Sequence, residues 1–266
     1  MNERKVTKVT LLHYIKLTYR SILFISAVIW YIWERMNYNK VSLNELPGGA
    51  GAVIPAIIWL VFMIEMVLRF FPSQWESPGC QKQFRKNYIS TGKTDIIIQD
   101  DNATVIVAFV WLILNASIGA LYMTDILDQG IMLLLSLAYS ICDIICILFF
   151  CPFQTWFLKN KCCSTCRIYN WDYAMMFTPL FFVPGKYTWS LLLASIILLA
   201  RWEFTVWKYP ERFSENTNSY FKCANCSEKL CVHKKQLRRL WDRLIIEKKK
   251  KEKRILQQIT VDEKGK

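Results

Sequence analysis

Five long apolar segments constrain the fold of this chain more than any other feature. A helix needs about 20 mostly apolar residues to cross a bilayer, and each segment has roughly that length. The five segments are 17–33, 52–71, 104–123, 131–151 and 187–207. Hydrophobic residues make up 53% of the chain, and they come in blocks rather than in alternation. The sequence therefore predicts an all-α, polytopic helical bundle in a lipid bilayer.

Lysine and arginine residues predict the orientation of these segments, because basic residues in short connections stay on the cytoplasmic side. The leader and the connections after the second and fourth segments are basic, and we assign Lys16 and Arg20 to the same cytoplasmic face. The connection that contains Asp125 and Asp128 has no basic residue and is expected outside. The first segment has no small-residue cleavage site, so we expect it to remain in the membrane.

The last segment fits this orientation only if a sixth, shorter segment precedes it. Residues 234–254 hold eleven Lys or Arg and three Asp or Glu, in a chain with a net charge of +13. A single outward crossing by 187–207 would place this basic stretch outside. Segment 173–183 is too short to cross alone, and Pro184-Gly185 favours a reversal. We therefore expect a membrane hairpin, 173–207, with a short or re-entrant first arm and both termini cytoplasmic.

The predicted organisation follows from these spans. Its parts are a cytoplasmic leader (1–16), a four-helix membrane region (17–158) with a cytoplasmic loop (71–101), a first cysteine knuckle (159–172), the membrane hairpin (173–207), a second cysteine knuckle (208–233) and a basic cytoplasmic tail (234–266). We expect the tail to lie on anionic lipid, since each basic residue near such a surface contributes about 1 kcal/mol. Nucleic acid is not an expected partner for a basic helix tethered to a membrane.

Two short motifs on either side of the hairpin hold six of the ten cysteines. They are KCCSTC, with Cys162, Cys163 and Cys166, and CANCSEKLC, with Cys223, Cys226 and Cys231. Two residues between cysteines allow both sulfurs to bind one ion at about 2.3 Å. We expect a four-thiolate metal site on the cytoplasmic face. Its predicted ligands are Cys163, Cys166, Cys223 and Cys226, with Cys162 and Cys231 as alternates.

The identity of the metal stays open between zinc and an iron–sulfur cluster. Paired CxxC motifs are typical of structural zinc sites, whereas surplus cysteines suit a cluster or redox site. The CxxCxxC run typical of cubane clusters is absent from the sequence. Disulfides are not expected where cytosolic thiols keep cysteines reduced. Separate reduced thiols, some of them palmitoylated near the bilayer, are the alternative to a metal site.

Asp143 is the candidate functional residue within the membrane. A carboxylate near the middle of segment 131–151 costs at least about 2.5 kcal/mol unless it is paired or hydrated. The alternative is a protonated Asp that bonds to a neighbouring helix for structural reasons. In the second segment, Glu65 stands four residues before Arg69, which predicts an ion pair within one helix.

Three functions fit these features. The first is an integral membrane protein with a Cys-ligated zinc or iron–sulfur centre, acting in electron or thiol redox with a cytoplasmic partner. The second is a helical-bundle transporter or channel with a purely structural zinc site and Asp143 in its pathway. The third is a membrane scaffold that binds a partner through the cysteine module. The sequence assigns no enzymatic activity.

Overall fold

The computed structural model describes residues 7–37, 43, 53–98, 101–158, 162–221, 226 and 228, with backbone only at 101, 163 and 221. In this part of the chain, the long helices are α1 (Lys8–Asn37), α2 (Val53–Arg69), α4 (Asp101–Met123), α5 (Gln129–Leu148) and α7 (Lys186–Lys208). The shorter helices are α3 (Pro78–Gln81) and α6 (Asp172–Phe177). Single helical turns lie at Arg85–Asn87, Phe153–Phe157, Cys163–Thr165, Tyr169–Trp171, Thr178–Phe182, Pro210–Arg212 and Ser219–Phe221. The predicted all-α class is confirmed for the described residues.

Four of the described helices are long and apolar enough to cross a membrane, namely α1, α4, α5 and α7. They support the prediction of a membrane protein. The helix α2 is also apolar, but its 17 residues span only about 26 Å, short of a hydrocarbon core about 30 Å thick. Phe70 and Phe71, which the sequence places in the same span, form a turn after the helix. A fifth crossing is therefore not confirmed.

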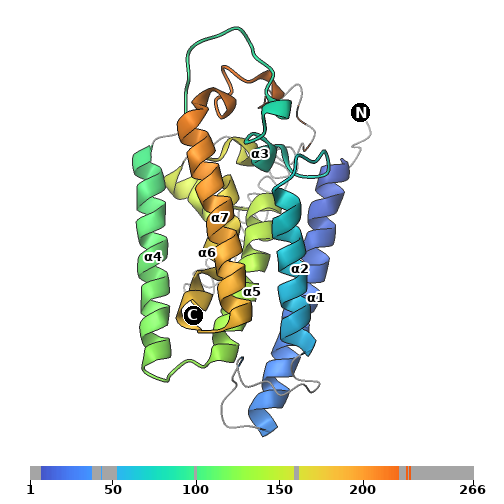
Figure 1. Cartoon of the computed structure of the whole chain (residues 1–266), viewed down its shortest axis with the longest axis vertical. Coiled ribbons are helices and arrows are strands. Elements are labelled where there is room, and N and C mark those ends of the chain that lie inside the picture. The colour runs from blue at the N-terminus through green and yellow to red at the C-terminus, as the bar shows by residue number, and fades with distance from the viewer. Residues whose placement is uncertain are drawn as a thin grey trace, which may run out of the picture.

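The core of the bundle lies between α1, α2, α5, α6 and α7. α1 packs against α5, α2 packs against α7 and α1, and α6 lies between α5 and α7 (Figure 1). The buried apolar side chains at their contacts are Ala27, Trp30, Ile58, Phe62, Met66, Leu133, Leu137, Tyr173, Met176, Phe177, Leu180, Leu191 and Leu198. This one continuous cluster holds the helices of the bundle together by close van der Waals packing, which drives helix association in lipid.

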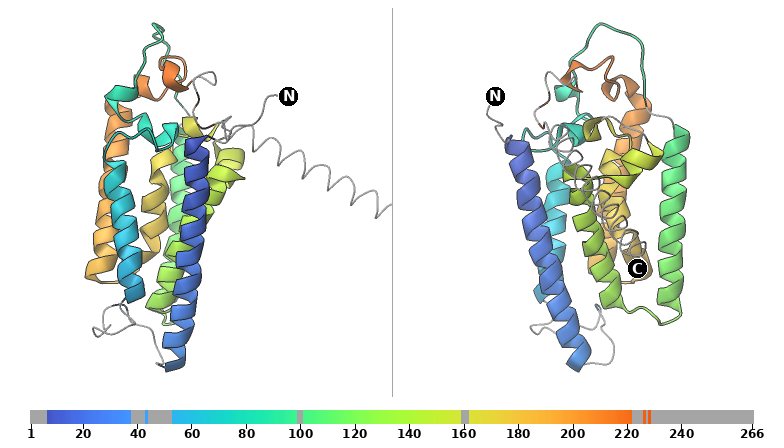
Figure 2. Two further views of the ribbon diagram at one scale, coloured as in Figure 1. Left: turned by 90° about the vertical axis from the view of Figure 1, so that its right-hand side faces the viewer. Right: turned by 180° about the vertical axis from the view of Figure 1, so that it is seen from behind.

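The helix α4 stands at one side of the bundle (Figures 1 and 2). It contacts the rest through the turns Thr178–Phe182 and Phe153–Phe157, and the Trp111 indole donates a hydrogen bond of 3.3 Å to the Thr178 hydroxyl. Gly119 faces Phe182 so closely that an added Cβ atom would overlap the ring. Most of the other α4 side chains are apolar and exposed, as expected for a surface that faces lipid.

The short helix α6 begins a hairpin inside the bundle. Proline residues at 179 and 184 interrupt the helical hydrogen bonding, so the chain leaves the regular helix and turns after Thr178–Phe182. The Thr188 hydroxyl donates to the carbonyl oxygen of Val183 at 2.8 Å and secures the turn. α7 then runs back along α6 to the end of the bundle where α6 began (Figure 1).

Three connections gather at this end of the bundle, which we call the loop end (Figure 1). They comprise residues 70–98, 162–171 and 209–221. Ser90 pairs with Asn218 in an isolated antiparallel bridge, which joins the first connection to the third. The Lys82 ammonium donates to the carbonyl oxygens of Ser164 (3.1 Å) and Cys166 (3.0 Å), which joins the first connection to the second. Segments far apart in the sequence are thereby fixed together above the helices.

Candidate functional site

The helix α1 buries one stripe of residues, which is polar toward the loop end and apolar farther along the helix. The buried positions recur at intervals of three, four or seven residues, which places them on one face of a helix. Toward the loop end this face carries His13, Lys16 and Arg20, and farther along it carries Ala27 and Trp30. The polar half of the stripe brings basic side chains into the interior, where each needs a partner.

Arg20 is the most deeply buried of these cations, with a side chain only 1% exposed. Its guanidinium donates to Glu65 of α2, with 2.6 Å between the Arg20 Nη2 and Glu65 Oε2 atoms. The other terminal nitrogen lies 3.5 Å from the Asp143 carboxylate of α5 and donates to the Ser140 carbonyl oxygen at 2.9 Å. One guanidinium is therefore shared by two carboxyl groups from two different helices.

The Tyr173 hydroxyl of α6 extends this cluster, because it donates to the same Glu65 oxygen at 2.6 Å. Arg69, one turn beyond Glu65 on α2, lies over the Tyr173 ring at 4.5 Å. Arg69 forms an ion pair with Asp172, the first residue of α6, and both side chains are almost fully buried. The polar contacts of α6 therefore hold its first turn against α2.

Lys16 bonds to Glu76 in the connection after α2, with 3.0 Å between Nζ and Oε1. Burial alone would raise the pKa of the Glu76 carboxyl, but the Lys16 and Arg69 cations together outweigh it and lower the pKa to about 2. Glu76 is thus ionised at any physiological pH. This pair ties the start of α1 to the loop end.

Glu228 comes from a distant part of the chain and contacts the residues at the loop end of this stripe. One carboxylate oxygen lies 2.8 Å from His13 Nε2, and the other accepts a hydrogen bond from the Ser77 hydroxyl at 3.0 Å. Its carbonyl oxygen accepts a bond of 2.9 Å from the Thr10 hydroxyl. The Glu228 side chain is 4% exposed, so it is a fixed part of this interior.

Together these groups form what we call the polar column. Its members are His13, Lys16, Arg20, Glu65, Arg69, Glu76, Asp143, Asp172, Tyr173 and Glu228. Five carboxyl groups therefore meet three Lys or Arg side chains and one histidine. Several buried atoms of the column have no hydrogen-bond partner among the described residues: His13 Nδ1, Arg20 Nε, Glu65 Oε1, Arg69 Nε and Asp172 Oδ1. Buried polar atoms of this kind are the ones that internal water molecules satisfy.

One sequence-based expectation about these residues is wrong, namely the ion pair between Glu65 and Arg69 within α2. Lys16 and Arg20 lie inside the bundle toward the loop end, where distant carboxylates compensate their charges, and α1 begins at Lys8 rather than at residue 17; their cytoplasmic side stays a prediction. Glu65 and Arg69 do not pair with each other, because α6 brings Tyr173 and Asp172 to them. The three-and-four spacing of basic residues that leads into Ala27 and Trp30 is the signal that could have shown that they are buried.

Asp143 lies at a different depth from the one expected. α5 ends at Leu148, so Asp143 stands about one and a half turns from the loop end of the helix rather than near its middle. Its carboxylate faces Arg20, and its side chain is 20% exposed, whereas the Glu65 side chain is 10% exposed. Of the two carboxyl groups that share Arg20, Asp143 is therefore the more loosely held and the more accessible.

The predicted cysteine site is only partly within the described residues. Cys166 is buried, and Cys162 and Cys226 are half-buried, all without disulfides. The Cys162 thiol lies 3.1 Å from the Ser164 hydroxyl. Cys223, Cys231 and the tail 234–266 lie outside the described residues, as does the side chain of Cys163. Among the residues whose side chains are described, no group of three potential metal ligands comes together.

Lys82 is a buried cation beside the first cysteine motif. This lysine was not identified from the sequence as a candidate site residue. It is 2% exposed, and its ammonium lies 5.2 Å from the centre of the Trp202 ring. Burial lowers the pKa of Lys82 to about 8, while the nearby Cys166 and Cys162 thiols favour its charged form. Burial and the Glu76 carboxylate raise the pKa of the neighbouring Cys80 thiol to about 12, so that Cys80 stays protonated.

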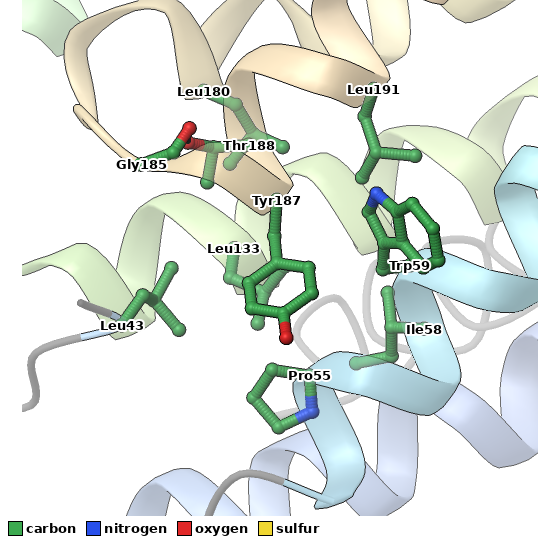
Figure 3. Close-up of a pocket in the computed structure, with 10 residues that line it drawn as sticks. All are labelled: Leu43, Pro55, Ile58, Trp59, Leu133, Leu180, Gly185, Tyr187, Thr188 and Leu191. Carbon is green, nitrogen blue, oxygen red and sulfur yellow. Dashed lines mark hydrogen bonds between the residues drawn. The ribbon is translucent and has the colours of Figure 1, made fainter. Parts of the chain in front are cut away.

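A small cavity lies at the opposite end of the bundle, between the first turns of α2 and α7 (Figure 3). Its volume is about 30 Å³, enough to hold a water molecule. The lining is almost entirely apolar, and the side chains of Tyr187, Pro55 and Leu133 converge on it (Figure 3). It holds none of the charged groups of the polar column and offers no acid or base to a ligand.

Comparisons with known proteins add no family to this description. A scan against protein-family models and searches of the curated proteins and of the solved structures found no match to the chain.

Proposed function

We propose that this chain is a multi-pass membrane protein that moves protons through the polar column, with Asp143 as the group that binds and releases the proton. The loop end and both termini are on the cytoplasmic side in this proposal. The observation that carries it is the single Arg20 guanidinium shared by the carboxyl groups of Glu65 and Asp143.

The sharing of Arg20 implies a bound proton. One guanidinium neutralises one carboxylate, and two carboxylates beside each other in a low-dielectric interior do not both stay ionised. Glu65 accepts two short hydrogen bonds, from Arg20 and Tyr173, which favour its ionised form. The proton therefore belongs to Asp143, whose carboxyl group lies farther from Arg20, at 3.5 Å.

A route from Asp143 toward the loop end follows the column. The unpartnered atoms of Arg20, Glu65, Arg69 and Asp172 lie along it and supply sites at which water can bind. Arg69 and Asp172 continue the line beyond Tyr173. His13 lies at the loop end of the route, with one ring nitrogen on Glu228 and the other unpartnered among the described residues, where water can bind.

Proton flux into proteoliposomes tests this function. The full-length protein is reconstituted into vesicles that contain the pH-sensitive dye pyranine, and an imposed pH gradient is followed with the potassium ionophore valinomycin present. We expect the wild-type protein to dissipate the gradient faster than protein-free vesicles and Asp143→Asn to abolish this difference. Asp128→Asn is the matched control, because Asp128 caps the other end of α5 and Asn preserves such a cap. Wild-type flux no faster than that of empty vesicles, or full flux in Asp143→Asn, would refute the proposal.

A metal–thiolate centre at the loop end is the second candidate function, with zinc or an iron–sulfur cluster as the group and electron or thiol redox as its role. Its proposed ligands are Cys163, Cys166, Cys223 and Cys226, with Cys162 and Cys231 as alternates. The supporting observation is the Lys82 ammonium, buried against the backbone of the first motif, because an anionic thiolate centre needs a nearby cation.

Anaerobic purification followed by an optical spectrum and metal analysis tests the second candidate. We expect stoichiometric zinc in a colourless protein or iron with the charge-transfer bands of a cluster, and loss of the metal in Cys166→Ser. Cys80→Ser is the control, since Cys80 is buried outside the two motifs. The centre would be excluded if the wild-type protein contained no metal. It would also be excluded if Cys166→Ser and the separate variants of the other proposed ligands all retained the metal.

A further inference from the structure

Cys146 and Cys151 form a pair of thiols at the loop end of α5, apart from the polar column and from both predicted knuckles. Cys146 lies in the last turn of the helix, which ends at Leu148, and Cys151 follows after the chain has turned. The two thiols are hydrogen-bonded to each other, and neither is in a disulfide. The Cys151 sulfur also accepts a hydrogen bond of 3.4 Å from the backbone amide of Gln154.

This arrangement gives the two sulfurs different chemical roles. A backbone N–H that points at a sulfur favours its thiolate form, so Cys151 is the nucleophile of the pair. Cys146 lies within hydrogen-bonding reach and is placed to attack a sulfur bonded to Cys151. Both side chains are half-buried, so that a small reagent can reach the pair while the sulfurs remain in contact. Cys142, one turn earlier on α5, is exposed and serves as a comparison.

We propose that Cys146 and Cys151 are a redox-active dithiol that forms a reversible disulfide by exchange with a small-molecule disulfide of the glutathione type. The Cys151 thiolate attacks one sulfur of the small disulfide, forms a mixed disulfide and expels the first thiolate. Cys146 then attacks the Cys151 sulfur as its own thiolate and expels the second. Two protein thiols are oxidised to one disulfide, and one small disulfide is reduced to two thiols, which take up the two protons that the cysteines lose.

The pair also has a direct structural connection to the column. Asp143 stands three residues before Cys146 on the same helix, within one turn. A disulfide between Cys146 and Cys151 links the last turn of α5 to the segment that follows it and fixes this turn. The dithiol does not depend on proton movement by Asp143, so that the two proposals can fail separately.

Redox titration of the full-length protein in detergent tests the dithiol. The protein is equilibrated in buffers with increasing ratios of oxidised to reduced glutathione, quenched in acid, alkylated and digested for mass spectrometry. We expect peptides that carry Cys146 and Cys151 to lose alkylation together and to appear as one linked species, lighter than the reduced pair by two hydrogen atoms. Reduction with dithiothreitol should restore both alkylated peptides.

Single variants identify the roles of the two sulfurs. In Cys146→Ser we expect Cys151 to accumulate as a mixed disulfide with glutathione, because the resolving thiol is gone. Cys151→Ser should form neither species at Cys146 over the same range, and the control Cys142→Ser should form the Cys146–Cys151 disulfide as the wild type does. Full alkylation of both cysteines across the titration, or oxidation that links either one to a different cysteine instead, would overturn the proposal.

Discussion

Replacement of Arg20 by Met is the perturbation that most directly tests the polar column as an energetic unit. Arg20 is 1% exposed and compensates Glu65 at 2.6 Å and Asp143 at 3.5 Å. Removal of one partner from a buried ion pair typically costs about 3–5 kcal/mol, because the remaining charge stays buried without compensation. Methionine fills a similar volume, so that little of the loss comes from a cavity. We therefore expect Arg20→Met to lower the free energy of unfolding by about 4 kcal/mol.

A second arginine on the same helix provides the control. Arg35 lies 3.6 Å from Asp128, but its side chain is 52% exposed, and an exposed pair contributes at most about 1 kcal/mol. Arg35→Met should therefore cost about 3 kcal/mol less than Arg20→Met. Equilibrium unfolding in mixed detergent micelles, followed by tryptophan fluorescence and circular dichroism, measures both losses on the same scale.

The double variant Arg20→Met with Glu65→Gln distinguishes charge from packing. If the uncompensated Glu65 carboxylate causes the loss, the double variant should lose at least about 1 kcal/mol less free energy of unfolding than the sum of the losses of the two single variants. Equal losses for Arg20→Met and Arg35→Met would refute the reasoning. Strictly additive effects of Arg20→Met and Glu65→Gln would show that the two side chains are not coupled.

Three further predictions concern the loop end, the contact of α4 and the orientation. Because the pKa of Glu76 falls from 4.5 to about 2 on folding, its ionised form stabilises the protein by up to about 3 kcal/mol above pH 4.5, and this contribution is lost as the pH falls toward 2. The stability difference between wild type and Glu76→Gln, measured by thermal unfolding, should therefore shrink between pH 7 and pH 3, and a difference that is constant with pH would contradict the assignment. Gly119→Ala should cost about 1–3 kcal/mol in denaturant unfolding by displacing the Phe182 ring, and Phe182→Leu in the same chain should recover part of the loss; an unchanged stability of Gly119→Ala would contradict this contact. An epitope tag placed after Lys266 should be labelled only after cells are permeabilised, and labelling of intact cells would contradict the cytoplasmic placement of the termini.

The positions of the apolar helices could be predicted well from the sequence. The predicted segment 187–207 corresponds to Lys186–Lys208 in the structure, and 131–151 corresponds to Gln129–Leu148. Lengths of this kind follow from local composition, because a helix in lipid must be apolar over its span. The start of α1 at Lys8 was not predictable in this way, since Lys16 and Arg20 look like a boundary until their partners are known.

The partners of the buried charges could not be predicted from local rules. The spacing of Glu65 and Arg69 suggests a pair within α2, but the fold offers each residue a partner from α6 instead, more than 100 residues away. Lys82 has no sequence signal at all, because a lysine in a polar connection is usually solvated, yet it is 2% exposed. Asp143 could be recognised as a candidate because a carboxylate in an apolar segment is unusual on composition alone.

The basic face of α1 makes the insertion of this helix depend on residues that are synthesised later. α1 leaves the ribosome before the acidic residues that will neutralise it, since Glu65 is made 45 residues after Arg20, and Glu76 is made 60 residues after Lys16. In lipid on its own, this helix would expose two cations, each at a cost of about 2.5–3.5 kcal/mol. Stable insertion of the first helix therefore depends on the arrival of α2 and of the connection after it, which carry Glu65 and Glu76. Nascent chains truncated before Glu65 should be held at the insertion machinery or degraded.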